Sequence, residues 1–420
     1  MTLPLAGVRV VSLTHYLQGP ACAQMLADLG ADMVKVERPG GAYERHWSGA
    51  QSYVGDESVF YLLAGRNQRS VELNLREPEG ADALWRLIED ADVVLENFRP
   101  GVLDKLGFSW DAMRARNPRL VFCSLTGFGP TGPSRLRPGQ DLLIQSLSGL
   151  TGLSGGAASI PTPVGSAIVD QHAAALGAMG VLAALFRREH TGEGGRVDSN
   201  LLSAALDLQI EPFNYHLNGA NLYPRSASGL GSRFHQAPYG VYETSDSYLT
   251  ISLSDGQTLA RAFNDPWLAG LSKEDQFTQR EEISARIAEH LRQATTAEWE
   301  ERLTQAGIWN APVRDYADVE ADPQLGANAS IMSFDHPRAG QVRVLGHPVL
   351  YDGEPLPLRI IPPSAGEHTT EVLESLGYSA DDLARMRADG AIGPDRELQP
   401  FDAKTEAPAT AYSKSARTTA

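Results

Sequence analysis

The chain holds little of what disulfide-rich or metal-clustering proteins require. Its 420 residues include only two cysteines, Cys22 and Cys123, each in an apolar context. Two isolated thiols indicate neither a disulfide framework nor a cysteine-based metal cluster. The ten histidines form no H-x-x-x-H pair, so that metal-binding motif is lacking as well. We therefore expect a protein without a metal site.

Positively charged residues are also few. Lysine and arginine number 36 against 52 aspartates and glutamates, which gives a formal net charge of −16 at pH 7. Nucleic acids and anionic membrane surfaces attract proteins that spread positive charge over a face, so we expect neither as a partner. Any anion site must then be a local one.

Targeting signals are also missing. The start, MTLPLAGVRVVSL, lacks the basic stretch and the long apolar stretch of a secretory signal, which predicts a cytoplasmic protein. An apolar helical run at 173–186 holds 14 residues, whereas a bilayer span requires about 20. This run predicts a helix buried in the protein core.

What the chain does contain is an alternation of short β-branched runs with helical patterns over its first 125 residues. GVRVVSL precedes ACAQMLADLGA and DMVKVE, and PEGADALWRLIEDA precedes DVVLENF. Such alternation predicts βαβ units on a parallel, Rossmann-like sheet. Later, YGVYETSDSYLTISL predicts a hairpin, and helical patterns follow at 256–263, 280–292 and 297–306. The expected fold class is α/β, with a large Rossmann-like domain and a smaller α+β domain.

The predicted domain limits follow these changes of pattern. A chain of 420 residues exceeds what one hydrophobic core usually organises, so two domains are expected. We assign 1–227 to the large domain, 228–328 to the small domain and 329–395 to a return to the large domain. The tail 396–420 is polar, rich in small residues and aperiodic, which predicts disorder.

Two glycine motifs suggest activities that their surroundings exclude. GFGPTG at 127–132 matches a dinucleotide fingerprint and follows a predicted strand, but Pro130 and Pro133 stand where the helix must open. GLSGG at 152–156 matches a nucleophile elbow around Ser154, yet a helical pattern precedes it and AASIPTP follows. We interpret both stretches as glycine loops.

Asp170 is the most informative single residue. It stands at the entry of the apolar helix, directly after a loop of prolines and glycines. Aspartate is a favoured helix N-cap, so capping of the first N–H groups explains the residue if it is taken alone. The second interpretation is a carboxylate with a chemical task.

Cations and amides follow several predicted strands. Arg38 follows DMVKVE and Arg76 follows SVELNL. Asn97 lies near the end of DVVLENF, Arg99 follows that stretch, and Lys105 lies one helix turn further on. In an open parallel sheet, ligands collect outside the carboxyl ends of the strands. These groups predict a phosphate site at that edge, with scattered surface charge as the alternative.

Several stretches together resemble one family. They are LAGVRVVSLTHYLQGPACAQMLADLGADMVKVERPG, GRNQRSVELNLREPEG, DVVLENFRPGVLDKLGF, GFGPTGP, VGSAIVDQHAAALGAMGVLAAL, TGEGGRVDSNLLSAAL and GEHTTEVLESLGYS. The chain resembles the family III CoA-transferases, which include formyl-CoA:oxalate and carnitine CoA-transferases and the α-methylacyl-CoA racemases. The resemblance, over about 3–383, implies coenzyme A as the acyl-CoA substrate, no metal, and an interlaced homodimer. Long crossovers around 200–228 and 326–350 fit such a dimer.

The resemblance also implies residue roles. Asp170 corresponds to the family's catalytic nucleophile, which forms an anhydride with the donor acyl group and then an aspartyl-CoA thioester. With an ordinary pKa near 4 it is expected to be ionised at neutral pH, aided by the helix N-terminus. The CoA-binding region corresponds to Arg38, Leu73, Asn74 and Leu75 (through their backbone), Arg76, Asn97, Phe98, Arg99, Lys105, Arg137 and Gln140.

The acyl end of the site is expected near His15 and Gln18, as contacts to the acyl group or to CoA. The family's formyl-CoA transferases carry a glutamine where this chain has Leu17, which speaks against formyl-CoA and oxalate as its substrates. Three further residues are candidates to meet an acceptor carboxylate, with plain surface positions as the alternative: Arg45, His46 and Trp47.

Two other activities stay open beside the expected acyl-CoA:carboxylate CoA-transferase. A 2-methylacyl-CoA racemase needs an acid/base pair at the α-carbon, and Gln140 stands where the family's racemases place a histidine. Glutamine cannot exchange a proton, which disfavours that activity. A non-catalytic CoA-binding protein would retain the arginines without needing Asp170. The expected function is therefore the movement of CoA between two small carboxylic acids.

Overall fold

The computed structural model describes residues 2–394, so the predicted disordered tail at 396–420 lies outside the described residues. The chain divides into two compact units, which are considered one at a time. The first comprises Met1–Ser124, Val181–Val197 and Ala327–Ala420, and the second comprises Leu125–Gly180 and Asp198–Gly326. The domain limits expected from the sequence stay a prediction.

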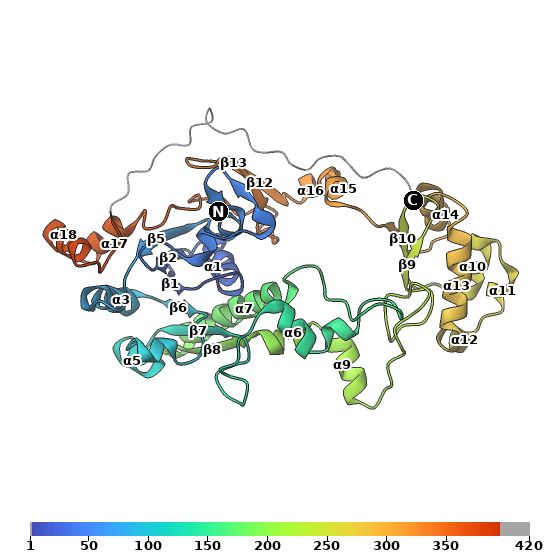
Figure 1. Ribbon diagram of the computed structural model, residues 1–420, viewed down its shortest axis with the longest axis horizontal. Coiled ribbons are helices and arrows are strands. Elements are labelled where there is room, and N and C mark those ends of the chain that lie inside the picture. Colours follow the sequence, from blue (N-terminus) through green and yellow to red (C-terminus); the bar gives the residue numbers. More distant parts are fainter. Residues whose placement is uncertain (1, 395–420) are drawn as a thin grey trace. The chain divides into compact units, whose positions relative to one another are not determined.

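A six-stranded sheet forms the centre of the first unit and confirms the predicted α/β class (Figure 1). The strand order is β5-β2-β1-β6-β7-β8. The pairs β1–β2, β2–β5, β1–β6 and β6–β7 are all parallel. The strands are β1 (Arg9–Leu13), β2 (Asp32–Glu37), β5 (Gln68–Glu72), β6 (Val93–Glu96), β7 (Val121–Thr126) and β8 (Gly195–Asn200).

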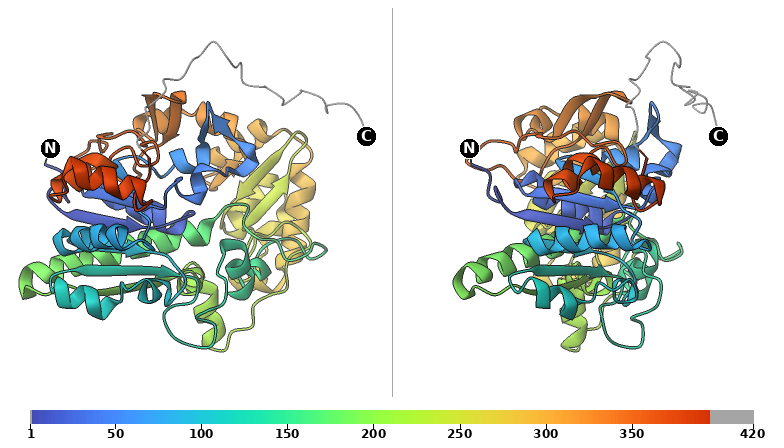
Figure 2. Two further views of the ribbon diagram at one scale, coloured as in Figure 1. Left: turned by 60° about the vertical axis from the view of Figure 1, so that its left-hand side comes forward. Right: turned by 90° about the vertical axis from the view of Figure 1, so that its left-hand side faces the viewer.

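Helices cover this sheet with their apolar faces. In α3 (Pro78–Asp90) the buried residues are Gly80, Ala83, Leu84, Leu87 and Ile88, the spacing of one helical face. They share a core with strand residues and with the C-terminal helices α17 (Thr369–Ser375) and α18 (Ala380–Ala388). Figure 2 shows these red helices beside the blue N-terminal strands. Chain segments far apart in sequence therefore complete one core.

Shorter elements make up the rest of the first unit. They are α1 (Gln18–Asp28), η1 (Tyr43–Arg45), η2 (Gly49–Gln51), β3 (Tyr53–Val54), β4 (Glu57–Ser58), α2 (Val59–Leu62), α4 (Val102–Lys105), α5 (Trp110–Arg116), β12 (Ile331–His336) and β13 (Gly340–Leu345).

The second unit has its own core, built on the three-stranded sheet β11-β10-β9. The antiparallel pair β9 and β10 is the predicted hairpin, and α10, α13 and α14 confirm the three predicted helices. The elements are α6 (Asp141–Leu147), η3 (Leu150–Gly152), α8 (Leu201–Asp207), α9 (Ile210–Leu217), β9 (Gly240–Glu243), β10 (Tyr248–Ile251), α10 (Gly256–Phe263), α11 (Pro266–Ala269), α12 (Lys273–Thr278), α13 (Arg280–Leu291), α14 (Thr296–Gln305), β11 (Asn310–Pro312), α15 (Tyr316–Glu320) and α16 (Pro323–Ala327).

Helix α7 (Ile168–Thr191) contains the apolar run, and it corrects the expectation of a helix buried in the protein core. Ala173, Ala174 and Val181 are buried, but Met179 is 61% and Phe186 70% exposed. Among the described helices it alone has the length and composition of a candidate membrane span, with 44% of the apolar window buried. One face thus packs inside the chain and the other is apolar and uncovered.

Candidate functional site

In the first unit, the carboxyl ends of β1, β2, β5 and β6 meet at one edge of the sheet, because all four strands run parallel. The residues that follow these ends are the ones selected from the sequence. The turn after β1 carries His15 and leads into Gln18, the first residue of α1. The turn after β2 carries Arg38, and the segment after β6 carries Asn97, Phe98 and Arg99. These residues do follow the carboxyl ends of parallel strands, and their convergence on one ligand stays a prediction.

His15 is held in place by the segment after β6. The Asn97 side chain accepts a hydrogen bond from the His15 N–H and donates one to the His15 carbonyl, both at 2.8 Å. The Phe98 ring meets the imidazole edge-on, with 4.7 Å between centroids. Burial, assisted by the nearby charge of Lys35, lowers the pKa of His15. The backbone of His15 is therefore held by Asn97, its ring contacts Phe98, and the lowered pKa favours the neutral imidazole.

Gly19 permits this close approach. A Cβ atom at position 19 would lie 2.5 Å from the Thr14 Cβ and 2.9 Å from the Asn97 Cγ. Both distances are far shorter than a van der Waals contact, so only glycine lets helix α1 begin here. One residue earlier, the Gln18 side chain is buried, and its amide nitrogen has no hydrogen-bond partner among the described residues. Such a donor is available to a ligand oxygen.

The predicted phosphate-binding cations lie on the surface of the same unit. Arg38, Arg76, Arg99 and Lys105 are all exposed. Arg38 donates from Nε to the Gly41 carbonyl at 3.2 Å, which keeps part of its guanidinium near the backbone. Exposed cations on short turns retain free N–H groups for an anion and pay little desolvation before it arrives.

The stretch 73–75 follows β5, where backbone contacts to CoA are predicted. Leu73 is buried and its N–H donates to the Glu37 carbonyl at 2.8 Å. The Asn74 N–H donates to the Ala391 carbonyl at 2.8 Å, and the Asn74 side chain donates to the Gly390 carbonyl at 3.1 Å. These N–H groups are already engaged within the chain. The role of this stretch in binding CoA stays a prediction.

Arg45 proves to be a structural residue and not a free cation for an acceptor acid. It forms a bidentate ion pair with Glu37, with Nη2 2.6 Å and Nε 2.7 Å from the carboxylate oxygens. Both side chains are buried. Burial alone would raise the pKa of Glu37, but the charge and hydrogen bonds of Arg45 lower it to about 2. The pair therefore stays charged and closed.

Asp170 belongs to the second unit, at the third position of α7. The capping is done by Asp141 at the start of α6, whose Oδ2 accepts the N–H groups of Val169 at 2.7 Å and Asp170 at 2.9 Å. Gln145, one turn along α6, donates to the other Asp141 oxygen at 2.6 Å and accepts the Val164 N–H at 2.9 Å. The N-cap interpretation of Asp170 is therefore wrong. Its carboxylate is left for another task.

The pKa of Asp170 also differs from expectation. Burial of the carboxyl, together with the negative charge of Asp141, raises this pKa to about 7 from a reference value of 3.8. The expectation of an ordinary pKa overlooked both effects, since it counted only the helix N-terminus. At neutral pH the carboxyl is thus divided between its acid and ionised forms. A raised pKa next to a second carboxyl is a frequent mark of a functional site.

Two further predicted residues, Arg137 and Gln140, also belong to the second unit and are exposed. The Arg137 guanidinium lies 6.0 Å from the centroid of the Phe128 ring. In the same loop, a Cβ at Gly127 would be 2.8 Å from the Gly139 Cα. Two backbone segments therefore cross closely here, which explains the first glycine of GFGPTG. The next helix begins only at 141, which agrees with the rejection of a dinucleotide site.

Sequence reasoning selected Gln140 but missed Asp141 and Gln145, which follow it in the chain. The available signal was the spacing of two polar residues four positions apart in an otherwise apolar helix. Both side chains are buried, Asp141 to 7% and Gln145 to 1% exposure. Buried polar residues at this spacing indicate a shared hydrogen-bonding task.

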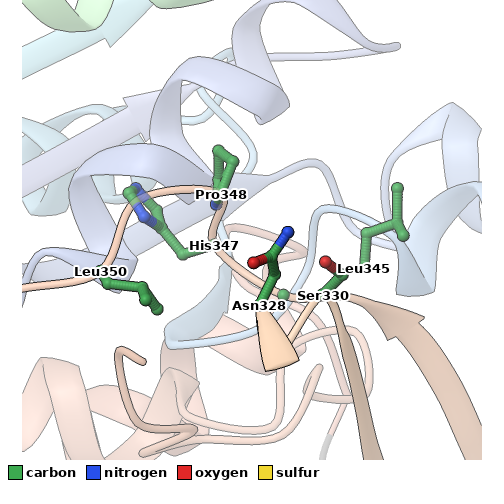
Figure 3. A pocket seen from close by; sticks show the side chains of 7 residues that line it. Asn328, Ser330, Leu345, His347, Pro348 and Leu350 are labelled. Atoms are coloured by element: carbon green, nitrogen blue, oxygen red, sulfur yellow. The ribbon is translucent and has the colours of Figure 1, made fainter. Parts of the chain in front are cut away.

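A separate cavity of about 460 Å³ lies in the first unit beside β13 (Figure 3). Its lining consists of Asn328, Ser330, Leu345, Gly346, His347, Pro348 and Leu350. None of the predicted site residues belongs to this lining, and the described residues contain no group of three or more potential metal ligands. The candidate site residues therefore lie away from this cavity, at the strand edge in the first unit and at the start of α7 in the second.

Comparisons with known proteins agree over nearly the whole chain. Residues 5–369 match CoA-transferase family III. Succinyl-CoA:glutarate CoA-transferase of Homo sapiens is 30% identical over 398 residues, covering 93% of this chain and 90% of that protein. Formyl-CoA:oxalate CoA-transferase of Shigella sonnei is 30% identical over 419 residues, covering 93% and 100%. A solved CAIB/BAIF family protein from Brucella suis superposes with a TM-score of 0.76 at 30% identity, covering 90% of this chain and 100% of that one.

Proposed function

The chain is an enzyme that belongs to CoA-transferase family III, and we propose that it moves CoA between two carboxylic acids with Asp170 as the nucleophile. The observation that carries this proposal is the environment of that carboxyl. It stands at the start of α7, half-buried, while Asp141 performs the capping that would otherwise explain it.

The proposed reaction has four balanced steps. An oxygen of ionised Asp170 attacks the acyl-CoA carbonyl, so that a C–O bond forms, the C–S bond breaks and CoA leaves as a thiolate. The thiolate then attacks the aspartyl carbonyl of this anhydride, which releases the donor acid and leaves an aspartyl-CoA thioester. The acceptor carboxylate attacks that thioester and releases the thiolate again. Attack of the thiolate on the acceptor acyl carbonyl yields the new acyl-CoA and free Asp170.

The carboxyl pKa of about 7 suits this cycle. A more basic carboxylate is a stronger nucleophile, and at neutral pH a substantial fraction of Asp170 is already ionised. Burial also keeps water from the anhydride, which would otherwise be hydrolysed and lose the thioester energy. Burial, the larger cause of the raised pKa, therefore also supports transfer over hydrolysis.

The CoA moiety is proposed to bind at the strand edge of the first unit. Exposed Arg38, Arg99 and Lys105 offer positive charge for its phosphates in a protein that is otherwise strongly acidic. His15 and the unpaired amide nitrogen of Gln18 are proposed to contact the acyl end. No metal is needed for any step.

We further propose a homodimer. In α7 the apolar residues Met179, Leu182 and Phe186 share an uncovered face, and in α6 Leu142 and Leu147 are exposed as well. Single chains rarely leave so many large apolar side chains in water. A second copy of the chain is the proposed cover.

The decisive experiment is the change Asp170→Asn, which preserves shape and removes the attacking oxygen anion. Turnover is expected to fall by about a thousandfold or more with the fold intact, because the covalent route is lost. Wild-type protein given an acyl-CoA without acceptor is expected to become sensitive to hydroxylamine, with the modification on the peptide that contains residue 170. Wild-type protein is also offered a panel of acyl-CoA donors and free acids, and the CoA thioesters that form are identified by mass spectrometry.

Full transferase activity in a verified Asp170→Asn protein, free of deamidation, would overturn the covalent mechanism. A protein that binds CoA but forms no new thioester with any donor would instead support the non-catalytic alternative. Exchange of the α-proton of a 2-methylacyl-CoA with solvent, without transfer, would support a racemase.

A further inference from the structure

Four aromatic side chains form a continuous row in the first unit, called here the aromatic row: Tyr16, Tyr43, Trp47 and Phe60. Ring centroids are 5.2 Å apart between Tyr16 and Tyr43, 6.2 Å between Tyr43 and Trp47, and 4.9 Å between Trp47 and Phe60. The first three are exposed to 57%, 45% and 43%. Grouped exposed aromatic surface of this kind marks a binding surface.

The row begins inside the turn that carries the acyl end of the proposed site. Tyr16 lies between His15 and Gln18, and its φ of +60° is a left-handed conformation that a tyrosine rarely adopts. The Asn97 hydrogen bonds to both backbone groups of His15 hold this turn in place. Strained backbone that neighbours over-determine is typical of functional positions. The Tyr16 ring on this turn is 57% exposed and begins the row at its contact with Tyr43.

The sequence pattern of the next turn has the same effect. In the stretch 43–47, Tyr43 and Trp47 are exposed, whereas Glu44 and Arg45 are buried. The turn therefore presents aromatic rings on one side and withdraws its charges to the other. A protein that only needed a soluble surface would have the opposite arrangement.

The charges under the row are already neutralised. Lys35 lies 2.7 Å from the Glu44 carboxylate and Arg45 lies 2.6 Å from the Glu37 carboxylate, and these side chains are at most 6% exposed. The exposed His46 uses Nε2 for a hydrogen bond with the Gly40 carbonyl at 2.8 Å. The exposed Arg38 is assigned to the CoA phosphates, and the ion-paired Lys35 and Arg45 offer no free charge. A second carboxylate lying against these rings would therefore lose its water without gaining either of these two cations.

We propose that the aromatic row is the wall that selects the acid, and that the enzyme prefers aromatic monocarboxylic acids over short dicarboxylic acids. This inference rests on the proposed CoA-transferase function and adds the substrate class. A flat apolar ring gains stacking area on Tyr16, Tyr43 and Trp47. A dicarboxylate such as glutarate gains no stacking area, and its second carboxylate would lie against an apolar surface.

The test compares 3-phenylpropanoate with glutarate as acceptors, each offered with acetyl-CoA, succinyl-CoA and formyl-CoA as donors. With the best donor, kcat/KM for 3-phenylpropanoate is expected to exceed that for glutarate by about tenfold or more. Trp47→Ala is expected to lower kcat/KM for the aromatic acid by about tenfold and for glutarate by less than about twofold. Trp47→Phe, which keeps a ring, is expected to restore most of the loss.

Trp309→Ala is the matched control, because Trp309 is an exposed tryptophan of the second unit. It is expected to leave both acids unchanged. A binding measurement separates recognition from chemistry. Calorimetry in the presence of CoA measures the binding of 3-phenylpropanoate to Asp170→Asn protein and to the double variant that also carries Trp47→Ala. The added change is expected to weaken this binding by about tenfold.

The two proposals fail in different ways. New thioesters that form preferentially on glutarate, or a Trp47→Ala loss that is equal for both acids, would overturn the role of the aromatic row while leaving CoA transfer intact. Absence of any new thioester together with absence of the hydroxylamine-sensitive modification at Asp170 would reject the proposed function, and this inference with it.

Discussion

Two carboxyl groups near one helix end have opposite tasks because their surroundings differ. Asp141 receives two backbone N–H groups and a glutamine amide, so its oxygens are fully engaged. Among the described residues Asp170 receives no side-chain hydrogen bond, and it feels both burial and its neighbour's charge. A carboxylate without donors is destabilised as an anion and therefore reactive. The structure thus separates a supporting carboxyl from a reacting one.

Replacing Asp170 by asparagine is expected to stabilise the protein at neutral and alkaline pH. The folded-state pKa is raised from 3.8 to about 7, so the stability linked to the protonated carboxyl is complete below about pH 4 and is lost as pH rises through about 7. In the variant, the asparagine side chain at this position carries no charge at any pH. The variant's advantage in Tm should therefore be absent near pH 4, grow with pH, and level off above about pH 7.

Thermal unfolding of both proteins across that pH range measures this difference. Asp207→Asn is a suitable control, because Asp207 pairs with His172 in the same unit at 2.7 Å and has no part in the pKa shift of Asp170. A Tm difference that stays constant with pH would show that Asp170 is not buried as described.

The exposed cations at the strand edge are also expected to act as individual residues, by binding the phosphates of CoA. Changing Arg38, Arg99 or Lys105 to alanine is expected to raise KM for the acyl-CoA donor by roughly tenfold, with a smaller effect on KM for the acid. Contacts to phosphate are made equally in ground and transition states, so kcat should change little. Steady-state kinetics with varied donor and varied acceptor distinguish the two constants. An effect confined to the acceptor KM would contradict the assignment.

At the scale of elements, much of the arrangement follows from local pattern. Alternating β-branched and helical runs predicted the parallel sheet, and parallel strands necessarily bring their carboxyl ends together. The contact between Asp141 and Asp170 could not be predicted in this way, because 29 positions separate them and neither helix pattern specifies its neighbour. The uncovered face of α7 was missed for a related reason. An apolar sequence predicts burial, but it does not state which chain provides the cover.

The pairing of α6 with α7 leads to a pH prediction. Wild-type kcat/KM is expected to fall as pH drops below about 7, because Asp170 must be ionised to attack. Asp141→Asn removes the neighbouring negative charge but keeps an oxygen for the α7 N–H groups. The pKa of Asp170 should then decrease, and the descending limb of the profile should move to lower pH.

The pH profiles of wild type, Asp141→Asn and the control Asp207→Asn decide this point. The control is expected to retain the wild-type limb. A limb that does not move in Asp141→Asn would mean that burial alone sets the pKa, and a loss of activity at every pH would indicate that the cap geometry has collapsed.

At the scale of the whole molecule, the uncovered apolar residues require an explanation. Met179 and Phe186 on α7 expose most of their side chains, and burying such a residue is worth roughly 1.5–3 kcal/mol. A monomer would forgo that energy at several positions in both units. Association with a second copy recovers it, and interlacing of two chains would make each core depend on its partner.

The proposed interlaced dimer predicts that no compact monomer exists. Sedimentation of the wild-type protein at decreasing concentration should show a dimer until the protein unfolds, because dissociation and loss of structure are then one process. Phe186→Glu places a charge on the α7 face and should abolish the soluble dimer, whereas Phe186→Leu, which keeps an apolar side chain, should sediment like the wild type. Phe186 is 70% exposed on α7 and its ring contact is with His190 of the same helix, so the substitution leaves the core residues of the chain in place. A compact, active monomer of either the wild type or Phe186→Glu would refute the interlaced dimer and leave the apolar face of α7 in need of another partner.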